Sequence, residues 1–144
     1  MQGNRHIRSE ITMSAKPVVL FVGSRDAACS QIAAGFLRDL GKDQFDVTTA
    51  GTDPAEIVDP LAMAVMTEID VVIGTELPQE LTEESVENAQ VVVAMSPAGE
   101  IPYLLGTRYE DWELENPEGQ GIEAFRRVRE EIRIRVETLI KSLS

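Results

Sequence analysis

The sequence has one cysteine and one histidine, and aromatic residues make up only 5% of its 144 residues. A single cysteine cannot form an internal disulfide, so the class of small disulfide-stabilised proteins is excluded. No run approaches the roughly 18 apolar residues that a membrane span needs. The first 16 residues also lack the apolar stretch of a signal peptide. These absences predict a cytoplasmic protein with no membrane association.

Basic side chains are scarce in the middle of the chain. The formal net charge is −12, and residues 53–118 carry 1 basic side chain against 16 acidic ones. A negative field of that strength repels phosphate backbones, so nucleic-acid binding is excluded. Two readings remain for the acidic segment: a solvated surface that keeps the protein in solution, or a docking face for a basic protein partner.

Hydrophobic residues are plentiful at 43%, enough for one packed domain, which we place at residues 16–144. Residues 1–15 are polar and unpatterned and predict a flexible tail. This tail contains His6, for which no ligand or catalytic role is expected, and Met13, which competes with Met1 as the true start. Nothing in the sequence indicates a metal site or a cofactor.

Strands and helices alternate along the predicted domain. The apolar run at 17–22 is typical of a strand buried on both faces, and a helix follows it at 30–41. Residues 45–50 alternate and are rich in β-branched side chains, which completes a strand–helix–strand unit. Further strands are expected at 89–95 and 107–112, and further helices at 60–68, 80–88 and 121–143. The pattern predicts an α/β fold with a four-stranded, mostly parallel sheet flanked by helices.

The segment between the first strand and the first helix is the candidate binding loop. Ligands of open parallel sheets bind at the carboxyl ends of the strands, where helix N-termini present backbone N–H groups to anions. Small side chains would let this backbone close around an oxyanion such as phosphate, arsenate or sulfate. The predicted oxyanion-binding residues are Ser24, Arg25, Asp26, Ala27, Ala28, Cys29 and Ser30.

Several motifs together resemble the low-molecular-weight tyrosine phosphatase superfamily. They are the strand 19–22 followed by Ser30-Gln31 and an Ala-Ala-Gly-Phe-Leu helix, then Ala50-Gly51-Thr52, and later Asn116-Pro117. The final helix adds Phe125-Arg-Arg-Val-Arg-Glu-Glu-Ile. The sequence is most similar to the arsenate reductases of that superfamily, coupled to thioredoxin or mycothiol. The resemblance spans residues 16–143 and implies a three-layer αβα fold.

The resemblance also implies where catalytic residues should be. In the family a loop cysteine attacks as a thiolate, an arginine six residues later clamps the oxyanion, and a late Asp-Pro pair supplies the acid. These positions correspond here to Gly23, Cys29 and Asn116. Glycine has no nucleophile, a cysteine is too short to clamp, and an amide is no acid. The resemblance therefore predicts a degenerate catalytic loop in a protein that has lost family catalysis.

Two alternatives remain open. Cys29 could serve as a relocated nucleophile or redox thiol in an active arsenate reductase or phosphatase, since a thiol in the first turn of a helix should be acidified. A displaced carboxylate, Glu113 or Glu115, could replace the missing acid. The protein could instead be an interaction module that uses its acidic segment.

Overall fold

The computed structural model describes residues 16–95 and 99–143. The expected tail at 1–15, with His6 and Met13, lies outside the described residues. The elements are β1 (Val18–Gly23), α2 (Cys29–Gly41), the 3₁₀ turn η1 (Lys42–Gln44), β2 (Asp46–Gly51), α3 (Pro60–Thr67), α4 (Glu83–Glu87), β3 (Val91–Met95), β4 (Arg108–Trp112) and α5 (Ile122–Leu143).

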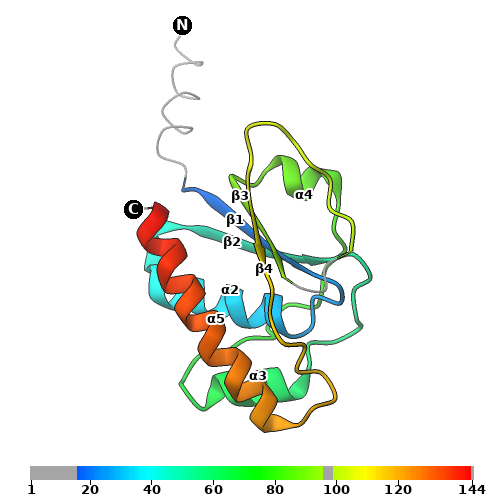
Figure 1. The fold of residues 1–144 in the computed structure, drawn as a ribbon, viewed down its shortest axis with the longest axis vertical. Coiled ribbons are helices and arrows are strands. Elements are labelled where there is room, and N and C mark those ends of the chain that lie inside the picture. The colour runs from blue at the N-terminus through cyan, green and yellow to red at the C-terminus, as the bar shows by residue number, and fades with distance from the viewer. Residues whose placement is uncertain (1–15, 96–98, 144) are drawn as a thin grey trace, which may run out of the picture.

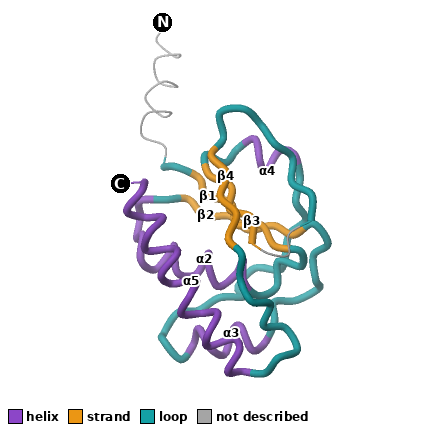
Figure 2. Tube along the Cα trace, in the orientation of Figure 1, coloured by secondary structure: helices purple, strands orange, loops and turns teal. Residues whose placement is uncertain are grey.

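The four strands form one sheet in the order β2-β1-β3-β4, and all three pairings are parallel. Strand β1 is central, which explains its unbroken apolar sequence: Val19 to Val22 have no exposed surface. The predicted four-stranded parallel sheet is confirmed. Because all four strands run in the same direction, their carboxyl ends lie at the same edge of the sheet. The loop between β1 and α2 lies at that edge (Figure 2).

Helices cover both faces of the sheet unequally (Figure 1). Helices α2, α3 and α5 lie on one face, where Phe21 of β1 packs among Ile32, Phe36 and Phe125. On the other face α4 and the chain beyond β3 cover Leu20, Val22 and Val92. The structure thus has the three layers that the family resemblance implied. Packing on the face covered by α2, α3 and α5 holds the start of α2 in place, and with it the loop that precedes the helix.

Helix α4 is shorter than the expected 80–88. The N–H of Gly51 donates to the carbonyl of Gln79 at 2.8 Å, and the N–H of Leu81 donates to the carbonyl of Gly51 at 2.9 Å, so this stretch is tied to the end of β2. Thr82 then caps the helix, because its Oγ1 accepts the N–H of Ser85 at 3.1 Å. A long-range pairing therefore overrides the helical pattern before residue 83.

The polar face of α5 does more than meet solvent. Arg126 pairs at 2.5 Å with Glu68, the residue that follows α3, and Arg129 pairs with the same carboxylate at 2.7 Å. Hydrogen bonds from these arginines lower the pKa of Glu68 to about 2. Glu68 and Arg126 remain partly exposed while the side chain of Arg129 is mostly buried, and together these pairs orient α3 against α5.

In the described ranges, no helix is both long enough and apolar enough to span a bilayer. Nor do three His, Cys, Asp or Glu side chains come together there in a group that could hold a metal ion.

Candidate functional site

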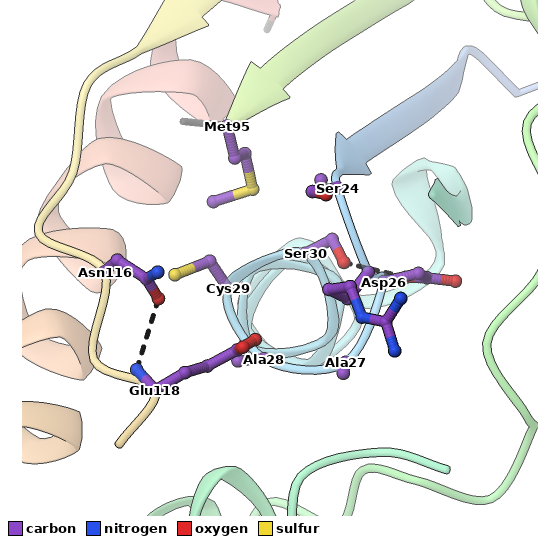
Figure 3. Close-up of a pocket in the computed structure, with 11 residues that line it drawn as sticks. Ser24, Asp26, Ala27, Ala28, Cys29, Ser30, Met95, Asn116 and Glu118 are labelled. Atoms are coloured by element: carbon purple, nitrogen blue, oxygen red, sulfur yellow. Dashed lines mark hydrogen bonds between the residues drawn. The ribbon is translucent and has the colours of Figure 1, made fainter. Parts of the chain in front are cut away.

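The three positions that the resemblance assigned to catalysis meet in one cavity (Figure 3). Its volume is about 190 Å³. It lies between the carboxyl end of β1, the start of α2 and the chain that follows β4. Its lining consists of Gly23, Ser24, Arg25, Asp26, Ala27, Ala28, Cys29, Ser30, Met95, Asn116 and Glu118. Every residue of the predicted oxyanion loop therefore lines the same cavity as Gly23 and Asn116.

The carbonyl groups of the loop all point away from this cavity. The carbonyls of Gly23, Ser24, Arg25 and Ala27 accept the N–H groups of Thr52, Asp53, Ala55 and Asp59 over 2.7–3.2 Å. The carbonyls of Asp26 and Ala28 accept Gln31 Nε2 and the N–H of Ile32. None of the residues from 52 to 59 lines the cavity. A row of backbone hydrogen bonds thus joins the loop to the segment 52–59, which follows β2.

The N–H groups of the loop consequently face the cavity. A trans peptide holds its N–H opposite its C=O, so each outward carbonyl turns the next residue's N–H inward. Within the described residues, the N–H groups from Ser24 to Cys29 donate to no partner. Successive inward N–H groups next to a helix N-terminus form a concave site for an anion. These N–H groups are the donors that the candidate site offers to a ligand.

Asp26 holds the loop in this shape. Its φ of 52° lies in the left-handed region, which Asp tolerates better than most residues. Its carboxylate is 1% exposed and accepts hydrogen bonds from four donors, namely Ser30 Oγ, Gln31 Nε2, Thr49 Oγ1 and the N–H of Gln79. Burial raises the pKa of Asp26 above 3.8, and the four hydrogen bonds oppose that shift. The side chain thus joins the loop to α2, to β2 and to the segment before α4.

Two glycines at the sheet edge play different parts. Gly23 and Gly51 are paired in the β1–β2 ladder. A Cβ at Gly51 would lie 2.8 Å from the carbonyl oxygen of Ser24, so only glycine lets β2 approach the loop backbone. A Cβ at Gly23 would find its nearest neighbour, Ser30 Oγ, at 3.7 Å. A side chain therefore fits at Gly23, and close packing does not account for the glycine there.

Cys29 begins α2, and its side chain extends toward Asn116 and Met95 (Figure 3). Burial raises the pKa of its thiol to about 12, and the charges of Glu118 and Glu131 add to the shift. The expectation of an acidified thiol is therefore wrong. The helix N-terminus favours the thiolate, but removal from water and two nearby carboxylates outweigh it.

Arg25, the one strong cation expected in the loop, is already paired. Its Nη1 donates to the Asp53 carboxylate at 2.9 Å and to the Asp53 carbonyl at 3.0 Å. Both side chains are largely exposed, so the pair holds the guanidinium only loosely. Arg25 lines the cavity but directs its charge toward the segment after β2.

The carboxylate that reaches the cavity is neither of the two expected. Glu115 pairs with Arg127 at 2.8 Å, and this hydrogen bond lowers its pKa; neither Glu115 nor Glu113 lines the cavity. Glu118 lines it instead, and its N–H donates to Asn116 Oδ1 at 3.2 Å. Met95 was also missed, although its place at the carboxyl end of β3 pointed to this edge. Glu118 had only its nearness to Asn116 as a signal.

Comparison with known proteins places this chain in a protein family. The family model for low molecular weight phosphotyrosine protein phosphatases matches residues 18–144. A glutaredoxin arsenate reductase of Synechocystis is 34% identical over 129 residues, which are 88% of this chain and 98% of that protein. A putative arsenate reductase of Halobacterium salinarum is 30% identical over 81% of this chain and 85% of its own.

Solved structures agree with these sequence matches. A thioredoxin-dependent arsenate reductase of Corynebacterium glutamicum has a TM-score of 0.80 and 32% identity, over 90% of this chain and 62% of that chain. An arsenate reductase in a phosphate-binding state has the same TM-score and identity, over 89% of this chain and 99% of its own. This chain belongs to the low molecular weight phosphotyrosine protein phosphatase family and is similar to its arsenate reductases.

Proposed function

We propose that this protein binds a tetrahedral oxyanion in the cavity after β1 and does not carry out the covalent chemistry of its family. The observation that carries the proposal is the row of outward carbonyls from Gly23 to Ala28, which leaves the loop N–H groups facing a cavity of about 190 Å³. The solved relative in a phosphate-binding state supports the choice of ligand. The proposal therefore assigns a binding role to the backbone of the loop and no reacting role to Gly23, Cys29 or Asn116.

Loss of catalysis is supported by what occupies each catalytic position. Family chemistry begins when a thiolate forms a bond to phosphorus or arsenic, and Gly23 offers no sulfur there. At Cys29 a thiol with a pKa of about 12 is almost entirely protonated at pH 7. Asn116 has no proton to give to a leaving group. Removal of a nucleophile alone costs several orders of magnitude in rate.

Binding and turnover are tested together on the purified protein. Titration calorimetry with phosphate and arsenate is expected to give saturable binding with a weak, millimolar Kd. Hydrolysis of p-nitrophenyl phosphate should equal the buffer rate. The rate of arsenate reduction, measured with reduced thioredoxin or glutaredoxin present, should also equal the rate in buffer alone. Cys29→Ala is the matched control and should bind as the wild type does. Turnover that survives repurification, or the absence of any saturable binding, would contradict the proposal.

A second candidate function keeps Cys29 as a relocated thiol, because its side chain lies in the cavity beside Asn116. The pKa separates the two functions. With a pKa of about 12, alkylation by iodoacetamide at pH 8 should be at least about a hundredfold slower than that of a free thiol. The rate should still be rising at pH 10. Urea-unfolded protein serves as the control, and a plateau below pH 8.5 in the folded protein would favour the enzyme.

A basic protein partner for the acidic segment stays a prediction. Three of its carboxylates, Glu76, Glu80 and Glu84, lie around a groove of about 750 Å³ that also includes Leu77. Placement in the cytoplasm likewise stays a prediction.

A further inference from the structure

The side chains of the cavity carry more negative than positive charge. Arg25, Asp26 and Glu118 are the charged residues in its described lining. The positive charge of Arg25 is paired with Asp53, and the carboxylate of Asp26 meets only uncharged donors. Attraction for an anion therefore comes mainly from backbone N–H groups, which supply partial charges near the start of α2.

Among these three charged lining residues, Glu118 is the one whose charged group has no hydrogen-bond or ion-pair partner in the described part of the chain. Within the described residues, its carboxylate takes part in no hydrogen bond and no ion pair, and only its backbone N–H is bound, to Asn116. Figure 3 shows its side chain extending from the chain after β4 toward Ala28, at the mouth of the loop. Its charge contributes to the raised pKa of the Cys29 thiol, so its field acts inside the cavity.

The balance between attraction by the backbone N–H groups and repulsion by Glu118 depends on the charge of the ligand. Inward N–H groups favour a negative ligand, but every unit of ligand charge is also repelled by Glu118. At the separation of neighbouring groups in a small, partly open cavity, one unit of charge changes binding on the order of tenfold. A dianion meets this repulsion twice and a monoanion once. An uncharged oxyacid does not meet it.

We propose that Glu118 is a specificity-determining residue that restricts the cavity to singly charged or uncharged tetrahedral oxyacids and rejects dianions. This inference rests on the proposed oxyanion binding and names its ligand class. Dihydrogen phosphate and dihydrogen arsenate belong to the accepted class, whereas hydrogen phosphate and sulfate belong to the rejected one. The charge at the mouth of the loop makes this distinction, since all these ions have nearly the same shape.

Sulfate and perchlorate test the inference, because both are tetrahedral and of similar size but differ by one charge. Their Kd values are measured by calorimetry at matched ionic strength in the wild type, Glu118→Gln and Glu113→Gln. Perchlorate should bind the wild type more tightly than sulfate. In Glu118→Gln the ratio of the sulfate Kd to the perchlorate Kd should fall about tenfold. Differences in hydration between the two ions cancel when this ratio is compared across variants.

Glu113→Gln is the matched control, because Glu113 is exposed, lies five residues before Glu118 and does not line the cavity. Its ratio should equal that of the wild type. An unchanged ratio in Glu118→Gln, with both ions binding, would overturn the inference and leave oxyanion binding intact. Failure of both ions to bind the wild type and Glu118→Gln would overturn oxyanion binding itself. Sulfate binding that appears only in Glu118→Gln would support the inference.

Discussion

Restoring three residues, Gly23→Cys, Cys29→Arg and Asn116→Asp, is expected to produce phosphatase turnover where the wild type has none. The introduced thiolate would attack phosphorus and form an S–P bond while the P–O bond to the leaving group breaks. The aspartic acid at position 116 would give its proton to that leaving oxygen. Water would then hydrolyse the S–P bond. A nucleophile in a preformed site is worth roughly three to six orders of magnitude.

The geometry of the cavity accommodates each of these changes. A Cβ at position 23 meets nothing closer than 3.7 Å, and the backbone N–H of Asp26 lies 4.0 Å from it. The side chain of residue 29 already lines the cavity, where a guanidinium could reach a bound anion and offset the negative charge of Glu118, so the variant accepts a dianionic phosphate ester. An aspartate at 116 keeps an oxygen to accept the N–H of Glu118. None of the substitutions falls at a backbone with positive φ.

The rate of p-nitrophenyl phosphate hydrolysis measures the gain, which should exceed the wild-type rate at least about a thousandfold. The matched control carries Gly23→Ser with the other two changes, since serine fits the same space without an acidic thiol. It should remain at the buffer rate. A restored variant that binds phosphate and yet hydrolyses nothing would show that the loop lacks the shape its carbonyl pattern indicates.

The local pattern predicted most of the fold because those elements depend on nearby residues. Strand β1 and helices α2 and α5 begin and end within one or two residues of expectation, since apolar runs and helical spacing specify them directly. Helix α4 was placed too early because Gln79 and Leu81 pair with Gly51, about 30 residues earlier in the chain. No local pattern contains a pairing of that range.

The residues that line the cavity likewise include features that the local sequence predicts and features that depend on distant residues. The loop could be recognised from its small residues and its position after a buried strand. The charge state of its side chains could not, because the partners come from elsewhere: Asp53 holds Arg25, and Glu118 acts on Cys29. Asp26 is the clearest case. The sequence shows only an acidic side chain within the predicted oxyanion loop, whereas in the structure its carboxylate is buried against four hydrogen-bond donors.

Asp26→Ala is expected to destabilise the fold by about 3–5 kcal/mol and to abolish oxyanion binding. The substitution leaves the N–H of Gln79 and three side-chain donors without their acceptor in a buried place. It also forces alanine to adopt a φ of 52°, which Asp accepts more readily. Urea unfolding measures the loss of stability, and calorimetry with phosphate measures binding below the unfolding transition.

Asp26→Asn is the matched variant, and its dependence on pH tests the role of the charge. Asparagine keeps the left-handed backbone and one acceptor for the N–H of Gln79, while Ser30 Oγ can rotate to accept its amide. The loss of stability in Asp26→Asn at pH 7 should stay within about 1.5 kcal/mol.

Because burial raises the pKa of Asp26 above 3.8, the folded wild type holds more protons than the unfolded chain at pH values between the unfolded and the folded pKa. Wild-type stability from this group therefore falls as pH rises through that range. The difference in unfolding free energy between wild type and Asp26→Asn should shrink from pH 4 to pH 7, and a difference that widens would mean that the four hydrogen bonds outweigh burial.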